Sequence, residues 1–125
     1  TEARTALRTA LLNQQTVLDF ENLGLLRLLY AADPEKETSL FVQELLGPLI
    51  EPDYQKHTDL LKTLDYYFEY AGNVKRISEE MFTHYNTIAY RIKSIQEITK
   101  KDLHNRNDHF LLEAAVYLYK FKVRF

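Results

Sequence analysis

The stretch Gly72–Glu97, GNVKRISEEMFTHYNTIAYRIKSIQE, contains two short amphipathic helical patterns with only Thr83 and His84 between them. Helices joined by so short a link meet at a steep angle, which indicates a helix-turn-helix. Four residues of the first pattern fall on one face at helical spacing: Val74, Ile77, Ser78 and Met81. Asn73 precedes this helix, and its side-chain oxygen can accept a free backbone N–H, so we expect it to be the N-cap.

The second pattern, Tyr85–Glu97, turns Ile88, Ile92 and Ile95 inward. Its other face mixes amide, phenol and cationic groups, which can meet base edges and phosphates. The residues of that face are Tyr85, Asn86, Ala89, Tyr90, Lys93 and Gln96, with Arg91 at the flank. The pattern therefore predicts a DNA recognition helix, although two amphipathic helices of a plain helical bundle would show the same periodicity.

Residues 84–103, HYNTIAYRIKSIQEITKKDL, resemble the C-terminal helix-turn-helix of PucR-type (purine catabolism regulator-like) bacterial transcriptional regulators. The family pattern has Gly-Asn before the first helix, then His-Arg-Asn-Thr-Leu-x-Tyr-Arg-Leu, then an Ile-x-x-x-Thr-Gly-x-Asp-Leu exit. The matching residues are Gly72, Asn73, His84, Asn86, Thr87, Tyr90, Arg91, Ile95, Thr99, Asp102 and Leu103. The resemblance implies a transcriptional regulator that binds double-stranded DNA in a sequence-specific way.

The chain departs from the family pattern at three positions. Tyr85 and Ala89 stand where the family commonly has Arg, so two expected cations are missing from the DNA-facing surface. Lys100 replaces the Gly of the exit turn. A second hypothesis follows, in which the helix-turn-helix has lost DNA binding and serves as a protein-interaction or dimerisation module.

Under the first hypothesis the candidate DNA-binding residues divide into two groups. Those expected to read base edges are Asn86, Tyr90 and Tyr85. Those expected to contact phosphate or to orient the helix are Lys75, Arg76, Thr83, His84, Thr87, Arg91 and Lys93. We expect no catalytic residue and no cofactor, because the sequence has no Gly-rich phosphate loop, nucleophile elbow or zinc-protease motif.

The composition favours a soluble, helix-rich globular chain: 125 residues, 46% hydrophobic, with only three Gly and three Pro. The absence of Cys rules out disulfides, a thiol nucleophile and Cys-based metal sites, and suits the cytoplasm. No apolar run approaches the ~20 residues of a membrane span. Residues 1–71 hold 6 Lys+Arg and 12 Asp+Glu, whereas residues 72–125 hold 10 and 6. A basic C-terminal half suits a polyanionic partner, although it is also compatible with ordinary surface charge.

The N-terminal part predicts a helix at Thr1–Leu12 and a short strand at Thr16–Phe20. This pair resembles the last helix and strand of the central domain that precedes the DNA-binding domain in PucR-type regulators. We therefore expect residues 1–52 to be the remnant of an α/β regulatory domain with linker helices, and residues 53–125 to be an all-α helix-turn-helix domain. A small-molecule effector would bind outside this chain, in a full-length protein that forms a dimer.

Further helices are predicted at Glu21–Tyr30, Thr38–Leu46, Asp53–Ala71 and Asn107–Val123. Gly47-Pro48 is expected to end the second of them, because Pro cannot continue the hydrogen-bond ladder. Five residues of the last helix are expected to face the core: Phe110, Leu111, Ala114, Leu118 and Phe121. The aromatic patch Tyr66–Tyr70 predicts either core and interface packing or a stacking surface for single-stranded bases.

The four histidines, at positions 57, 84, 104 and 109, form no i, i+4 pair, which argues against a metal site. His104 and His109 lie near Asp102 and Asp108 and could converge across a loop. A polar surface turn explains these four residues more simply.

Overall fold

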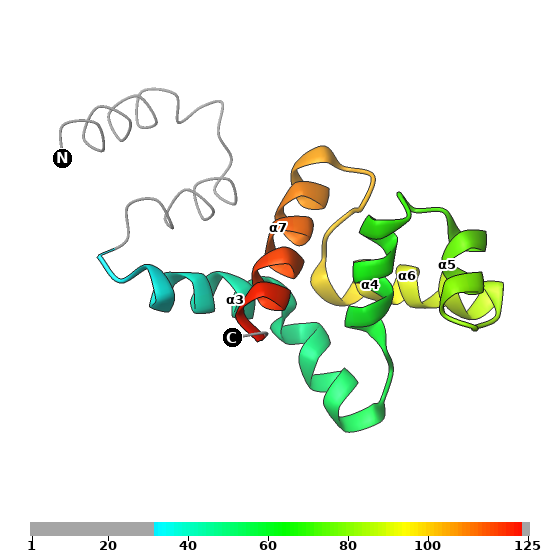
Figure 1. Ribbon diagram of the computed structural model, residues 1–125, viewed down its shortest axis with the longest axis horizontal. Helices are drawn as coiled ribbons and strands as arrows, with labels where there is room; N and C mark the ends of the chain where they lie inside the picture. Colours follow the sequence, from blue (N-terminus) through cyan, green and yellow to red (C-terminus); the bar gives the residue numbers. More distant parts are fainter. Residues whose placement is uncertain (1–31, 124–125) are drawn as a thin grey trace. The chain divides into compact units, whose positions relative to one another are not determined.

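The computed structural model describes residues 32–123, and all regular structure in this range is α-helical (Figure 1). The helices are α3 (Pro34–Lys56), α4 (Leu60–Glu69), α5 (Val74–Glu80), α6 (Tyr85–Thr99) and α7 (Arg106–Val123). The all-α class is thus confirmed for this range, while the predicted helices Thr1–Leu12 and Glu21–Tyr30 and the predicted strand Thr16–Phe20 lie outside it. The chain divides into two compact units at Phe41/Val42, and the second unit contains most of α3 and all of α4, α5, α6 and α7.

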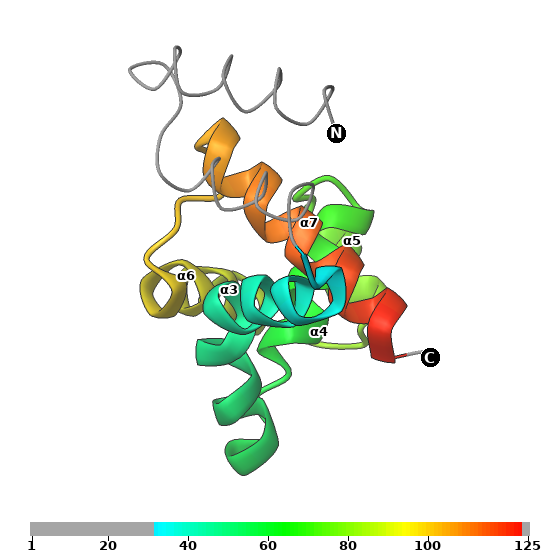
Figure 2. The ribbon, with the colours of Figure 1, turned by 90° about the vertical axis from the view of Figure 1, so that its left-hand side faces the viewer.

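Helix α4 is the centre of this second unit, because it contacts α5, α6 and α7 (Figures 1 and 2). Helix α6 also packs against α5, which completes the predicted helix-turn-helix. The residues that these helices bury most completely include Leu64, Ile77, Ile88, Ile95, Leu111 and Leu112. No helix among the described residues is long and apolar enough to cross a membrane.

Helix α3 continues through Gly47-Pro48 to Lys56, so the predicted helix end at Leu46 is wrong. A proline inside a helix costs about 3 kcal/mol, since it removes one backbone hydrogen bond and crowds the preceding turn. Leu46 and Leu49 flank this site, and both are fully buried. Burying such a side chain stabilises the fold by about 1.5–3 kcal/mol, which favours the continuous helix although α3 contains two prolines, Pro48 and Pro52.

The expected helix Asp53–Ala71 is divided at residues 57–59, where α3 ends and α4 has not begun. Asp53 joins the two helices, because its carboxylate accepts the backbone N–H groups of Leu60 and Leu61, each at 2.8 Å. It also accepts the hydroxyl of Thr58. The first N–H groups of a helix lack partners within it. Asp53, in the last turn of α3, provides acceptor oxygens for two of these N–H groups, which lie seven and eight residues farther along the chain.

Helices α4 and α5 end in the same way, each with a residue in the left-handed region at the position after the C-cap. In α4 this residue is Ala71, with φ 51°, and the N–H of Gly72 donates to the carbonyl of Tyr67 at 2.8 Å. A Cβ on Gly72, whose φ is 75°, would lie 3.1 Å from the Tyr67 ring. In α5 the equivalent residue is Phe82, also with φ 51°.

Helix α7 has the predicted position but a different rotation. Phe110 and Phe121, expected in the core, are 52% and 56% exposed. The buried face consists of Leu111, Leu112, Ala115 and Val116. Apolar residues of α7 occur on most sides of the helix, so the spacing of apolar residues did not identify a single buried face. Its rotation follows a contact with α4, where the His109 ring meets Phe68 edge-on with centroids 4.9 Å apart.

Candidate nucleic-acid interface

The first helix of the pair, α5, begins at the cap that the sequence predicts. The side chain of Asn73 accepts the N–H of Arg76 at 3.1 Å, and Ile77 on the inner face is fully buried. Both features are local in the sequence. The prediction of this helix and of its N-cap is confirmed.

The second helix, α6, is capped by His84, whose Nδ1 accepts the N–H of Asn86 at 3.0 Å. Ile88 and Ile95 are buried beneath it. The first two turns therefore present a polar and aromatic surface to solvent. Its exposed residues are Tyr85, Asn86, Thr87, Ala89, Tyr90 and Lys93. We call this set the α6 face; Asn86, Tyr90 and Lys93 share one helical row on it, at i, i+4 and i+7.

The cations of α5 lie exposed next to this helix, but one of them has a partner. Arg76 forms an ion pair with Glu80 at 3.1 Å, and its guanidinium lies 5.4 Å from the centroid of the Tyr70 ring. An exposed ion pair of this kind contributes at most about 1 kcal/mol. Arg76 can therefore exchange Glu80 for a phosphate at little cost, and Lys75 is exposed beside it.

Two of the predicted site residues, Thr83 and Arg91, are half-buried instead. The hydroxyl of Thr83 donates to the carbonyl of Met81 at 3.0 Å, within the turn. The Nη1 of Arg91 is buried, and no hydrogen-bond partner for it exists within the described part of the chain. A buried donor without an acceptor is costly, and a ligand in solvent cannot reach this atom.

The polar residues around His104 and His109 serve the turn between α6 and α7. Asp108 accepts the N–H of Asp102 at 2.9 Å, and Asp102 accepts the N–H of His104 at 2.8 Å. The side chain of Asn105 caps α7 by accepting the N–H of Asp108 at 3.0 Å. Among residues 32–123 no group of three His, Cys, Asp or Glu side chains is arranged to hold a metal ion.

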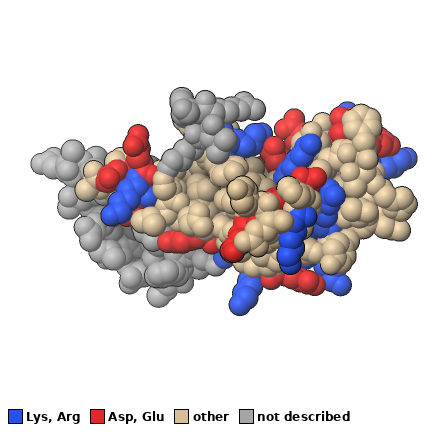
Figure 3. Space-filling view, turned by 90° about the horizontal axis from the view of Figure 1, so that it is seen from below, with Lys and Arg blue, Asp and Glu red and all other residues tan. Residues whose placement is uncertain are grey.

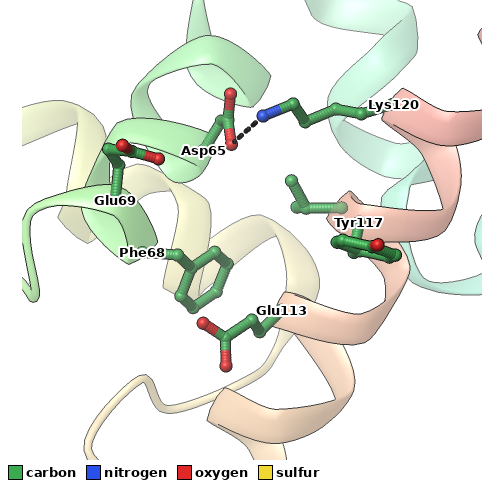
Figure 4. Close-up of a pocket in the computed structure, with 7 residues that line it drawn as sticks. Asp65, Phe68, Glu69, Glu113, Tyr117 and Lys120 are labelled. Atoms are coloured by element: carbon green, nitrogen blue, oxygen red, sulfur yellow. Dashed lines mark hydrogen bonds and ion pairs between the residues drawn. The ribbon is translucent and has the colours of Figure 1, made fainter. Parts of the chain in front are cut away.

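A cavity of about 280 Å³ lies between α4 and α7 (Figure 4). Its lining residues are Asp65, Phe68, Glu69, Glu113, Val116, Tyr117 and Lys120. The ammonium of Lys120 is already paired with Asp65 at 3.1 Å, which leaves two carboxylates, Glu69 and Glu113, facing the space. This lining repels phosphate, and no residue of α6 belongs to it. The cavity is separate from the α6 face.

Basic and acidic side chains are interspersed on the surface that Figure 3 shows, without one continuous basic area. On this face a polyanion would therefore meet individual cations and not a continuous basic area.

Comparison with known proteins decides the family of this unit. Residues 60–118 match the model of the PucR C-terminal helix-turn-helix domain, and this range holds α4, α5, α6 and most of α7. These residues belong to the PucR C-terminal helix-turn-helix family. Proteins of this kind regulate transcription, and no enzyme family is indicated. The suspected resemblance is thereby confirmed.

Three relatives of the PucR-type domain are named regulators. The proline-responsive transcriptional activator PutR of Bacillus subtilis is 34% identical over 106 residues, covering 82% of this chain and 26% of the activator. The DNA-binding transcriptional activator AdeR of the same organism is 27% identical over 102 residues, covering 82% and 24%. The carbohydrate diacid regulator of Escherichia coli is 36% identical over 76 residues, covering 60% and 20%.

The matched region thus spans about a quarter or less of each relative's length. No solved structure matches this chain. The PucR-type domain also contains two features that sequence reasoning missed. One is the Asp53 cap, whose partners are too distant in sequence to be seen in a local pattern. The other is Phe82, an apolar residue in the turn between α5 and α6, whose exposure helical periodicity does not predict.

Proposed function

We propose that the PucR-type domain binds double-stranded DNA in a sequence-specific way and brings a transcriptional regulator to its operator. The observation that carries this proposal is the α6 face, which follows a four-residue link after α5 and contains amide, phenol and ammonium groups. A recognition helix meets base edges with residues of its N-terminal part. Asn86 occupies that part and is exposed.

Base reading is assigned to Asn86, with Tyr90 and Tyr85 beside it. An Asn side chain pairs with adenine through two hydrogen bonds, one to N6 and one to N7. Tyr90 and Tyr85 are 70% and 51% exposed, so their rings and hydroxyls are available to bases and phosphates. His84 acts indirectly, because its cap fixes the direction in which the first turn of α6 points.

Phosphate contact is assigned to Lys75, Arg76, Thr87 and Lys93, with Arg91 gripping a phosphate while its stem packs against the fold. Arg91 is half-buried, so this role would fall to the accessible part of its side chain, since Nη1 itself is buried. Thr83 is assigned to the turn. Phosphate contacts position a protein on the duplex and carry no sequence information themselves.

The full-length regulator is proposed to be a cytoplasmic dimer that places two such domains on half-sites about one helical turn apart. One domain alone buries too little surface for high specific affinity. Residues 1–52 are proposed to be the end of a regulatory domain, and a small-molecule effector would bind outside this chain. The names of PutR and the carbohydrate diacid regulator are compatible with such effectors for those proteins.

The test compares Asn86→Ala with Arg91→Ala in fluorescence-anisotropy titrations, using a duplex selected by this chain from a random pool and a scrambled duplex. Asn86→Ala is expected to cost about 1–3 kcal/mol on the selected duplex and much less on the scrambled one. Arg91→Ala is expected to weaken both similarly and to reduce the salt slope by about one phosphate.

Ile98→Ala, near the C-terminal end of α6 and outside the α6 face, serves as a control for general damage to the helix, combined with circular dichroism of every variant. Unchanged affinities for both Asn86→Ala and Arg91→Ala in folded proteins would contradict DNA binding by this surface. The interaction-module hypothesis predicts instead an association that responds little to salt, since an apolar protein interface releases few counterions.

A further inference from the structure

Phe82, in the turn between α5 and α6, combines two unfavourable features. Its φ is 51°, in the left-handed region that glycine adopts most easily. Its side chain is 96% exposed, the largest exposure among the large hydrophobic residues of the described range. Gly is common in the turn of a helix-turn-helix. A glycine here would remove both costs, so the ring has no evident role within the unit itself.

The backbone of Phe82 is well defined, because hydrogen bonds hold the turn. The N–H of Phe82 donates to the carbonyl of Glu79 at 3.3 Å, and the N–H of Thr83 donates to that of Ser78 at 3.0 Å. These two bonds form the closing motif that often ends a helix. Met81 and Thr83 on either side are half-buried. Phe82 is therefore presented outward by a fixed turn.

We propose that the Phe82 ring packs against the DNA duplex, on deoxyribose carbons and a thymine methyl at the edge of the groove that α6 enters. This inference rests on the proposed DNA binding. Phe82 lies two residues before His84, the cap of α6, and four before Asn86, so it stands at the end of α6 that carries the proposed base-reading residues. Sugar carbons and thymine methyls are the apolar surfaces that a duplex offers, and Phe is among the side chains that meet them.

The choice of DNA over a second protein copy rests on the place of Phe82 directly before α6. Tyr85, the first residue of α6, is 51% exposed, so two exposed aromatic rings lie three residues apart at the start of the helix assigned to bases. Tyr90 continues it one turn and more along the helix. Apolar contacts of these aromatic rings with DNA would compensate for the charge attraction lost at Tyr85 and Ala89, where the family commonly has Arg. Apolar contact then supplies affinity that does not depend on salt.

The test is Phe82→Gly in the 125-residue chain, titrated against the selected duplex and against a duplex carrying a single half-site. The melting temperature is expected to rise by roughly 2–6 °C, because glycine removes the left-handed strain. Affinity for both duplexes is expected to fall about five- to tenfold. The salt slope should stay unchanged, because no charge is removed.

Ala71→Gly is the matched control. Ala71 occupies the equivalent position at the end of α4, with the same φ of 51°, but it carries no ring. This variant should also gain thermal stability, and its DNA affinity should equal that of the wild-type chain. Phe82→Leu, which keeps an apolar side chain, should retain part of the affinity.

Three results would overturn the inference. If Phe82→Gly binds like wild type while Asn86→Ala does not, α6 contacts DNA and the ring does not. If the affinity of Phe82→Gly falls for a selected duplex with two half-sites but not for the duplex with a single half-site, the ring contacts a second copy of the domain. If the wild-type chain binds no duplex, the proposed function fails first, and this contact fails with it.

Discussion

Replacement of Ile88 by alanine is expected to lower the free energy of unfolding by about 2–5 kcal/mol. Ile88 is fully buried and lies in α6, which packs against both α4 and α5. Alanine would leave a cavity at the junction of three helices, where none can move in to fill it without losing its other contacts. Domains of this size have about 5–15 kcal/mol in total, so the variant would approach the limit of stability. Urea denaturation followed by circular dichroism measures the change.

Tyr90→Ala is the control, because Tyr90 lies two residues farther along α6 and is 70% exposed. It should change the free energy of unfolding by no more than about 0.5 kcal/mol, as expected for a surface position. Equal stability of Ile88→Ala and wild type would contradict the packing of α6. The pair also separates folding from binding: Tyr90→Ala should lose DNA affinity while it remains folded.

The helix-turn-helix could be predicted from the sequence because its determinants are close together. Asn73 is three residues from the N–H that it caps, and the isoleucine spacing of α6 places Ile88 and Ile95 inward without reference to the rest of the chain. The exposed residues of the candidate site could also be predicted, because on a helix the exposed positions are known once the buried positions are known. Eight of the ten predicted residues are exposed, and only Thr83 and Arg91 are half-buried.

Features that depend on distant partners were beyond the sequence. The helix break expected at Gly47-Pro48 does not occur, since burial of Leu46 and Leu49 decides the matter. The buried face of α7 differs from the predicted one where this helix packs against α4, with His109 against Phe68, more than 40 residues away. Both errors have one cause: a local pattern was used where tertiary packing determines the outcome.

Asp53→Ala is expected to lower the free energy of unfolding by about 2–3 kcal/mol, because several hydrogen bonds to a charged acceptor are lost and two helix N–H groups lose their partner. One oxygen, Oδ1, accepts Leu60 N–H and the Thr58 hydroxyl, and the other, Oδ2, accepts Leu61 N–H. Asp53→Asn keeps only one acceptor oxygen. It should fall between Asp53→Ala and wild type.

Asp59→Asn is the control that separates hydrogen bonding from charge. Asp59 directly precedes α4, the position at which a sequence pattern places the cap, yet its side chain makes no capping hydrogen bond. Both Asn variants remove one negative charge near the start of the same helix, so the loss of interaction with the helix dipole is similar, at about 0.3–1 kcal/mol. The additional loss in Asp53→Asn then measures mainly the hydrogen bonds, because Asp53 also lies at the C-terminal end of α3 and Asp59 has a φ of 54°. Equal destabilisation by the two Asn variants in urea denaturation would show that charge stabilises α4, and that the link from α3 contributes little.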